Sequence, residues 1–381
     1  MKIVVAPDKF KGTATADEAC DALEEGIRRV LPDAEVVRVP LADGGEGTLQ
    51  AALSAGATAM FATVTGPLGN AVEAHWAALR GPLGTTAVIE SAIASGLALV
   101  DPTPETARTA CSTGTGELIL AALEHGVSEI ILGLGGSAMS DGGAGALQAL
   151  GARIRDAEGE TVGAGGAALR TAATLDLSDL DPRLHAVRLR LAVDVDNPLT
   201  GPRGAAAVFG PQKGADAETV DVLEEGLRRW SALLESTTGH SPELPGAGAA
   251  GGLPAAFLAT THAECVEGSA LVAELVDLDR LLQGADLVIV GEGSLDEQSL
   301  GGKAPIAAAR RAAARGIPVA AVAGVVSVSA DTLADHGIGR VVALVDLAGD
   351  ADAARRDARH WLTEAGARIA ASPPVAVHPV G

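Results

Sequence analysis

The feature that most constrains the fold is a unit that recurs along the chain. It consists of a short run rich in β-branched residues, a loop bearing Gly and Asp, and a segment with helical spacing of apolar residues. The unit occupies residues 2–31, 35–56, 128–151 and 285–316, and another apolar run at 318–326 follows it. Strands that alternate with helices form parallel sheets covered on both faces. We therefore predict an α/β fold whose ligands bind at the carboxyl ends of the strands.

The first predicted helix carries clear local signals. Thr15 and Glu18 have the spacing of a capping box. Apolar residues then recur at helical intervals, namely Ala19, Leu23, Ile27 and Leu31. This pattern predicts a helix that begins just after Thr15.

The middle of the chain has a different texture. Residues 86–100, 112–126 and 189–201 predict a mixed α/β region with a helix at 112–126. The Pro-containing end of the chain, 372–381, predicts a flexible tail.

Composition excludes several classes of partner. The formal net charge is −21, whereas nucleic acids and anionic membranes both require a basic face. The longest apolar stretch, 317–330, is shorter than the roughly 20 residues of a membrane helix. The apolar run before Pro7 is too short for a signal peptide, and three distant cysteines favour reduced thiols. We expect a cytoplasmic protein that binds neither nucleic acid nor membrane.

Every loop that follows a predicted strand contains an acid. These acids are Asp8, Asp43, Asp141, the pair Asp194 and Asp196, and Asp296. Carboxylates hold Mg²⁺, and Gly-rich backbone at helix N-termini binds anions. Each Asp could equally serve only its turn, and Ser137 could be a simple helix N-cap.

Lysine is rare in this chain, and its positions are therefore informative. Only five of the 28 basic residues are lysines, and four of them lie in predicted loops: Lys9, Lys11, Lys213 and Lys303. An ammonium group acts as a point charge on phosphate or carboxylate. Gly loops, acids and lysines together favour phosphoryl transfer. Neither the P-loop pattern at Lys303 nor the dinucleotide pattern at Gly291–Asp296 is complete.

At these same loops the sequence closely resembles the bacterial glycerate kinase family. Nine stretches carry the resemblance, in family order: APDKFKGTATADEA (6–19), VPLADGGEGT (39–48), VTGPLG (64–69), STGTGELI (112–119), GLGGSAMSDGGAGALQALGA (133–152), DVDNPLTG (194–201), FGPQKGA (209–215), PGAGAAGG (245–252) and VGEGSLDEQSLGGKAP (290–305). Together they span nearly the whole chain.

The resemblance implies ATP- and Mg²⁺-dependent phosphorylation of D-glycerate, with 2-phosphoglycerate favoured over 3-phosphoglycerate as product. It also implies two α/β domains with the active site in the cleft between them. One domain is Rossmann- or flavodoxin-like with a parallel sheet, formed by 1–75 and 280–375, and the other is a mixed α/β insertion at 76–279. The protein is expected to be a monomer or a homodimer.

Three positions depart from the family pattern. Lys9 stands where the family usually has Ser, so Lys11 carries the match. Met139 and Ser140 replace Thr and Asn, and the shorter Ser140 leaves its role open. Val193 replaces a Cys, which excludes thiol chemistry there.

The resemblance and the residue chemistry together predict the site. The expected catalytic residues are Asp194, Lys11, Asp43 and Lys213, with Asp43 or Asp194 as the base that accepts the hydroxyl proton. The expected ATP-binding residues are Gly135, Gly136, Ser137, Asp141, Gly142, Gly291, Gly293 and Lys303. The expected glycerate-binding residues are Asp8, Gly44, Gly45, Glu46 and Asn197, and the expected Mg²⁺ ligands are Asp194 and Asp296.

Two other functions remain open at this point. A nicotinamide-dependent oxidoreductase needs the dinucleotide pattern that is incomplete here, and Asp43 lies farther from the first strand than the roughly 20 residues typical of a ribose-binding acid. A non-catalytic metabolite sensor would keep the pocket and lose the chemistry.

Overall fold

The computed structural model describes residues 1–374 and divides into two compact units. Unit 1 comprises Met1–Asp43, Gln50–Ala55 and the chain from Gly268 onward, and unit 2 comprises Gly44–Leu49 and Gly56–Glu267. The α/β class agrees with the sequence, and the boundaries of the two units lie elsewhere than the expected domain boundaries near 75 and 280. The physical reason is strand pairing, because β3 (Thr58–Thr65) pairs along its whole length with β4 (Ala71–Gly81) and so belongs to the sheet of unit 2. Most of the predicted tail lies outside the described residues.

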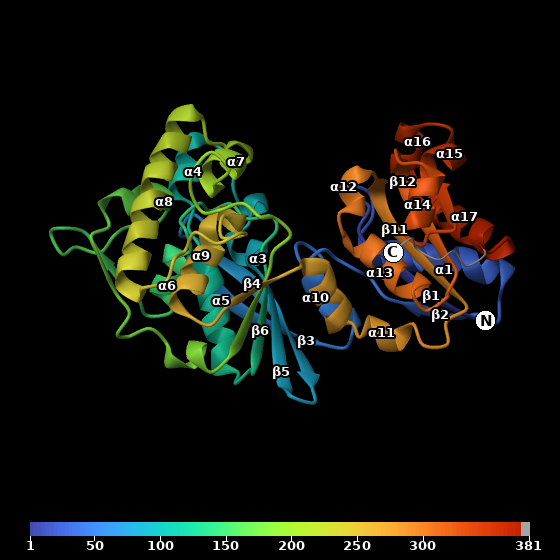
Figure 1. The fold of residues 1–381 in the computed structure, drawn as a ribbon, viewed down its shortest axis with the longest axis horizontal. Helices are drawn as coiled ribbons and strands as arrows, with labels where there is room; N and C mark the ends of the chain where they lie inside the picture. Colours follow the sequence, from blue (N-terminus) through green and yellow to red (C-terminus); the bar gives the residue numbers. More distant parts are fainter. Residues whose placement is uncertain (375–381) are drawn as a thin grey trace. The chain divides into compact units, whose positions relative to one another are not determined.

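Unit 1 contains a fully parallel sheet of five strands (Figure 1). The strand order is β13-β12-β11-β1-β2. The strands are β1 (Lys2–Pro7), β2 (Glu35–Arg38), β11 (Leu287–Leu295), β12 (Val319–Val326) and β13 (Arg340–Ala343). The helices are α1 (Ala16–Val30), α10 (Gly268–Leu275), α11 (Leu278–Leu281), α12 (Glu297–Leu300), α13 (Ala304–Ala313), α14 (Ala330–Asp335), α15 (Leu344–Ala348), α16 (Ala351–Arg356) and α17 (Ala358–Ala371), while α2 (Thr48–Ser54) is divided between the two units.

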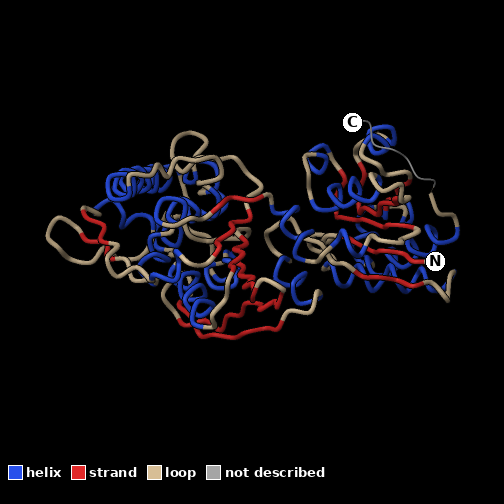
Figure 2. Tube along the Cα trace, turned by 60° about the horizontal axis from the view of Figure 1, so that its bottom comes forward, coloured by secondary structure: helices blue, strands red, loops and turns tan. Residues whose placement is uncertain are grey.

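Both faces of this sheet are covered, as the apolar strands predicted. Val4 and Ala6 of β1 belong to a buried cluster that includes α10 and α13. The alternate residues Ile3 and Val5 belong to a second cluster with α1 and α17. Side chains of a strand point to opposite faces in alternation, so one short run supplies two cores. Figure 2 shows these strands lying side by side among the helices of the unit.

Helix α1 begins as the capping box predicted. The Thr15 hydroxyl accepts the backbone N–H of Glu18, and the Glu18 carboxylate accepts that of Thr15. The helix packs against α17 through glycines: a β-carbon at Gly26 would collide with the carbonyl oxygen of Thr363, and one at Gly366 would meet Leu23 in the same way. The two backbones therefore approach more closely than any larger residue allows.

Unit 2 contains a mixed sheet of six strands in the order β10-β9-β6-β5-β4-β3. The hairpin β3–β4 and the β4–β5 pair are antiparallel, and the remaining pairs are parallel. The strands are β3 and β4 as above, β5 (Gly84–Glu90), β6 (Glu129–Gly133), β9 (Arg188–Ala192), β10 (Glu264–Val266) and a separate pair, β7 (Arg153–Arg155) and β8 (Thr174–Asp176). The helices are α3 (Ser91–Ser95), α4 (Pro104–Thr109), α5 (Thr113–Glu124), α6 (Ala144–Ala149), α7 (Ala205–Phe209), α8 (Ala217–Thr238) and α9 (Leu253–Thr260), joined by short 3-10 turns.

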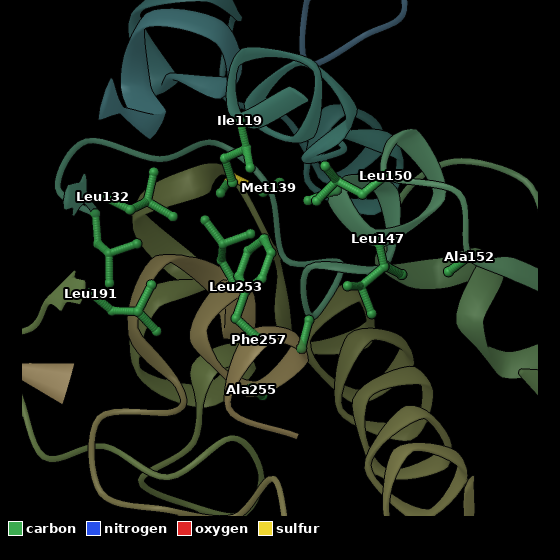
Figure 3. Close-up of a cluster of buried hydrophobic side chains, with 14 of the residues drawn as sticks. Ile119, Leu132, Met139, Leu147, Leu150, Ala152, Leu191, Leu253, Ala255 and Phe257 are labelled. Carbon is green, nitrogen blue, oxygen red and sulfur yellow. The ribbon is translucent and has the colours of Figure 1, made fainter. Parts of the chain in front are cut away.

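The core of unit 2 lies where β6 and β9 meet α5, α6 and α9. Figure 3 shows Leu132 and Leu191 of the two strands converging on Ile119, Leu147 and Phe257 of the three helices. Trp76 and Trp230 are also buried and pack in this core. This core fixes the loop from Leu134 to Gly143, which leaves β6 and enters α6.

No helix in residues 1–374 is long and apolar enough to cross a membrane.

Candidate active site

Two acids lie next to each other on neighbouring strands in unit 1: Asp8 directly follows β1, and Glu292 lies within β11. Pro7 of β1 and Gly291 of β11 are paired in the parallel register, so Asp8 and Glu292 come next on adjacent strands. Only 7% of Asp8 and 6% of Glu292 is exposed. The carboxyl ends of adjacent parallel strands are where α/β sheets bind ligands, and this is where the structure places predicted residue Asp8.

The surroundings of Asp8 disfavour its charged form. Burial, and next the negative charge of Asp43, raise the pKa of Asp8 to about 7. The backbone N–H of Lys9 donates to Asp8 Oδ1 at 2.6 Å and opposes this shift, while the charge of Glu292 adds to it. Asp8, Asp43 and Glu292 therefore form one electrostatic cluster.

The glycines of the GEG stretch are explained by packing. A β-carbon at Gly291 would lie 2.8 Å from the carbonyl oxygen of Val322, and one at Gly293 would lie 3.3 Å from the backbone nitrogen of Lys11. Small residues here let the DKFKG loop lie against β11. The side chain of Lys11 is exposed, and no ion pair within residues 1–374 engages it.

Glu292 is the residue of this cluster that sequence reasoning missed. Its Oε2 accepts the Ser299 hydroxyl at 3.0 Å and lies 3.5 Å from the Lys303 ammonium. Its Oε1 is buried and has no hydrogen-bond partner in the described part of the chain, 1–374. The available signal was its position at the end of the predicted strand, within the quoted stretch VGEGSLDEQSLGGKAP.

Asp296 and Lys303 flank the short helix α12. The Asp296 carboxylate accepts the backbone N–H of Ser299 as the N-cap of α12. This hydrogen bond lowers the pKa of Asp296. Lys303 directly precedes α13 and is the N-cap residue of that helix.

In unit 2, Asp141 is fully buried and ties two segments together. Its carboxylate accepts the backbone N–H and the hydroxyl of Ser112, both at 2.8 Å, and the backbone N–H groups of Gly143 and Gly145, both at 3.2 Å. Burial raises the pKa of Asp141, and these four hydrogen bonds oppose the shift. The carboxylate predicted to contact ATP is therefore fully used in joining the STGTG segment to the start of α6.

Lys213 points into the loop that follows β6. Its ammonium nitrogen donates to the carbonyl oxygen of Met139 at 2.5 Å and lies 3.3 Å from the hydroxyl oxygen of Ser137. Burial lowers the pKa of Lys213 to about 7, and the negative charge of Asp141 opposes the shift. Ser137 is not a helix N-cap, because α6 begins at Ala144 with Gly143 before it.

Other predicted glycines of unit 2 let segments approach closely. A β-carbon at Gly135 would lie 3.0 Å from the Cα of Gly45. The carbonyl oxygen of Gly136 accepts the backbone N–H of Leu97. The carbonyl oxygen of Gly142 accepts the indole N–H of Trp230 at 2.9 Å.

The segment Gly44–Leu49 is tied to β5 by a buried acid. Glu90 Oε1 accepts the backbone N–H groups of Gly47 and Leu49, at 2.9 and 2.8 Å. A β-carbon at Gly133 would lie 2.9 Å from the carbonyl oxygen of Gly44. The predicted substrate segment Gly44, Gly45 and Glu46 therefore lies beside the end of β6.

The loop after β9 holds the remaining predicted residues. Asp194 is exposed there, and Asp196 forms an ion pair with Arg203 at 2.6 Å that lowers the pKa of Asp196. The Asn197 side-chain amide donates to the carbonyl oxygen of Arg203.

The predicted residues thus fall into two groups. The group in unit 1 consists of Asp8, Asp43, Lys11, Gly291, Gly293, Asp296 and Lys303. The other predicted residues belong to unit 2. Within residues 1–374, no group of three or more His, Cys, Asp and Glu side chains could hold a metal ion by itself.

Comparison with known proteins identifies the family. The model of the glycerate kinase family matches residues 3–372. The chain belongs to the glycerate kinase family. It is therefore an enzyme, as the motifs predicted, and the resemblance found in the sequence is confirmed.

Individual relatives cover nearly the whole chain. It is 44% identical over 374 residues to "Glycerate kinase" of Bacillus subtilis (strain 168), covering 98% of this chain and 97% of the relative. It is 44% identical over 374 residues to "Glycerate 2-kinase" of Escherichia coli (strain K12), covering 98% of each. A solved structure of a Salmonella typhimurium LT2 protein assigned as glycerate kinase 2 superposes with a TM-score of 0.84, at 41% identity and 98% coverage of both chains.

Proposed function

We propose that this glycerate kinase family member transfers the γ-phosphoryl group of ATP to D-glycerate and forms 2-phosphoglycerate. The observation that carries the choice of product is the 44% identity, over 98% of both chains, to the Escherichia coli protein named glycerate 2-kinase. We also propose a cytoplasmic location, where ATP is available.

The turn that contains Lys303 is our proposed site for ATP phosphates. A helix N-terminus carries partial positive charge and orphan N–H groups, and Lys303 directly precedes the 10-residue helix α13. The ammonium of Lys303 would add a full positive charge where negative charge must be neutralised. Gly135, Gly136 and Ser137 in unit 2 stay in the proposal as nucleotide-binding residues.

Mg²⁺ is proposed as the metal that accompanies ATP. Kinases hold this ion with one or two carboxylates, waters and phosphate oxygens, so a cluster of three protein ligands is not required. Asp194, exposed after β9, suits this role better than Asp296, which caps α12. When bound, the ion would neutralise charge on the transferring phosphoryl group.

D-glycerate is proposed to bind near Asp8 and Lys11, with Gly44, Gly45, Glu46 and Asn197 as further proposed contacts. The exposed ammonium of Lys11 can meet the substrate carboxylate. Asp43, whose charge acts on Asp8, is the preferred base, because Asp194 is assigned to Mg²⁺. The base would accept the hydroxyl proton as the oxygen forms its bond to the γ-phosphorus and the bond from that phosphorus to the departing ADP breaks.

Lys213 and Asp141 are proposed to shape the loop after β6 rather than to react. The polar atoms of each side chain form hydrogen bonds within the protein. Lys213 contacts Met139 and Ser137, and Asp141 accepts hydrogen bonds from Ser112. A loop held from inside presents its backbone in one conformation, which is the preorganisation that phosphoryl transfer relies on.

The test is a coupled assay of ADP release with purified protein, Mg·ATP and D-glycerate, with ³¹P NMR of the product. We expect ADP release that depends on D-glycerate and a 2-phosphoglycerate signal. A 3-phosphoglycerate signal would support glycerate kinase activity but contradict 2-phosphoglycerate as the product. ATP binding without turnover of any small hydroxy acid would favour the alternative that the protein is a non-catalytic metabolite sensor.

A further inference from the structure

Two buried carboxylates of this protein are satisfied very differently. Asp141 accepts four hydrogen bonds, and both of its oxygens are used. Glu292 has both of its polar contacts, Ser299 and Lys303, on Oε2, and its buried Oε1 has no partner among the residues that the structure describes. Most buried polar atoms in proteins are paired, so an exception calls for an explanation. Structural stability alone accounts for Asp141 but not for Glu292.

The cation beside Glu292 reaches toward solvent. The side chain of Lys303 is 37% exposed, whereas that of Glu292 is 7% exposed. Lys213 differs, because it is buried and bonded to a backbone carbonyl. Lys303 therefore has a fixed, buried counter-ion and remains accessible to a ligand.

The two charges depend on each other. Burial raises the pKa of Glu292, and the positive charge of Lys303 is the largest influence that opposes the shift, followed by the Ser299 hydroxyl. An ion pair with one buried partner adds little stability compared with an apolar pair, and such pairs can be retained for another reason. Here that reason is the location of the ammonium group, which a flexible four-carbon stem would otherwise leave undetermined.

Ser299 fixes the carboxylate in turn. Its hydroxyl donates to Glu292 Oε2, and its backbone N–H donates to Asp296 as part of the α12 cap. The chain of contacts therefore runs from α12 through Glu292 to the residue that precedes α13. Secondary structure holds the backbone of each member, because Glu292 lies in β11, Ser299 lies in α12 and Lys303 precedes α13.

We propose that Glu292 is a positioning residue for phosphoryl transfer, which holds the Lys303 ammonium at the N-terminus of α13 where ATP phosphates bind. The proposal rests on the proposed function. Glu292 acts through Lys303 and does not itself contact the nucleotide.

The test is a double-mutant cycle of Glu292→Gln, Lys303→Met and the double variant, with kcat and KM measured for ATP. Lys303→Met should lower kcat/KM by about 10²-fold, as loss of one charge-stabilising donor does. Glu292→Gln should lower it by about 10- to 100-fold, the range for a residue that orients a functional group, with a raised KM for ATP. The double variant should be no worse than Lys303→Met, because Glu292 has nothing left to position.

Three results would overturn the proposal: a double variant whose losses multiply, a Glu292→Gln variant with wild-type kinetics, or one whose kcat falls while its KM for ATP is unchanged. The last pattern indicates only a smaller fraction of folded enzyme. Glu297→Gln is the matched control, since Glu297 is exposed on α12, and it should behave as wild type. If Glu292→Gln does not fold, Glu292→Asp should show an intermediate KM for ATP, and a wild-type KM there would refute positioning.

Calorimetric titration of Mg·ATP separates this proposal from the proposed function. ATP affinity should fall in Glu292→Gln and Lys303→Met alike, without any need for turnover. If wild-type protein binds ATP but does not phosphorylate D-glycerate, the proposed function fails while the positioning of Lys303 is still measured. Equal ATP affinity in wild type and Glu292→Gln would overturn the positioning role.

Discussion

Replacing Asp8 by Asn should change how the stability of unit 1 depends on pH, and the size of this change can be calculated. Asn has nearly the shape of a protonated Asp, and its side-chain oxygen can still accept the Lys9 N–H that Asp8 Oδ1 accepts. The variant therefore imitates the neutral form at every pH. Asp43 and Glu292, the acids that act on Asp8, stay in place.

The magnitude follows from the two pKa values. The pKa of Asp8 is about 7 in the folded protein against 3.8 ordinarily, and each unit corresponds to about 1.4 kcal/mol. Below pH 3.8 both states are protonated, and above pH 7 both are ionised. Between these values the folded state binds more protons, so wild-type stability falls as pH rises. The full loss relative to Asp8→Asn is about 4 kcal/mol.

The assay is hydrogen exchange of peptides that cover β1 and β11, for wild type and variant, from pH 5 to pH 8. Peptide resolution is needed because a chain of two units need not unfold in one step. We expect the stability of Asp8→Asn relative to that of wild type to increase steadily with pH and to level off near pH 7. Asp33→Asn, at an exposed aspartate of the same unit, is the control. A difference between Asp8→Asn and wild type that does not vary with pH would refute the reasoning.

The remaining predictions concern buried groups. Lys213→Met should remove a pH dependence of the stability of unit 2. Because the pKa of Lys213 is lowered to about 7, wild-type stability should rise from pH 7 toward pH 10, while that of the variant should not. Hydrogen exchange of α6 peptides can test this difference. Asp141→Asn should destabilise unit 2 by about 3 kcal/mol, because an amide nitrogen cannot accept the donors that Asp141 holds; an unchanged urea midpoint would contradict this. Gly26→Ala should lower the thermal midpoint, since overpacking of about 1–3 kcal/mol against Thr363 exceeds a helix-propensity gain of about 1 kcal/mol; a raised midpoint would show that α1 and α17 can separate at little cost.

Local signals predicted much of the secondary structure. The capping box at Thr15, the helix at 112–126 and the strand at 318–326 correspond to α1, α5 and β12. These features depend on neighbours within about four residues, through hydrogen bonds and side-chain periodicity that are legible in the chain itself. The role of Ser137 was harder to predict from the sequence. A serine before a Gly-rich stretch is typical of a helix N-cap, yet α6 starts only at Ala144.

The acids show where local signals stop. Asp8, Asp141 and Asp296 look alike in the sequence, as acids that follow predicted strands. In the structure Asp8 is buried beside other acids, Asp141 is saturated by four donors, and Asp296 caps a helix. Their partners come from residues up to 29 positions away in the case of Asp141. Glu292 was missed because its burial comes from the packing of β11 between neighbouring strands and not from residues near it in the chain.

The sequence by itself determined the alternation of strands and helices, the placement of acids and lysines at strand ends, and the glycerate kinase family, because all of these are written in short, contiguous stretches. Only the tertiary structure decided that β3 belongs to the sheet of unit 2, that Lys213 is buried against Met139, and that Glu292 pairs with Lys303. Burial and ion pairing depend on which distant segments pack together. The burial and the distant partners that shift the pKa of Asp8 and Lys213 are therefore set by the fold, whereas the cap at Asp296 depends on its neighbour Ser299.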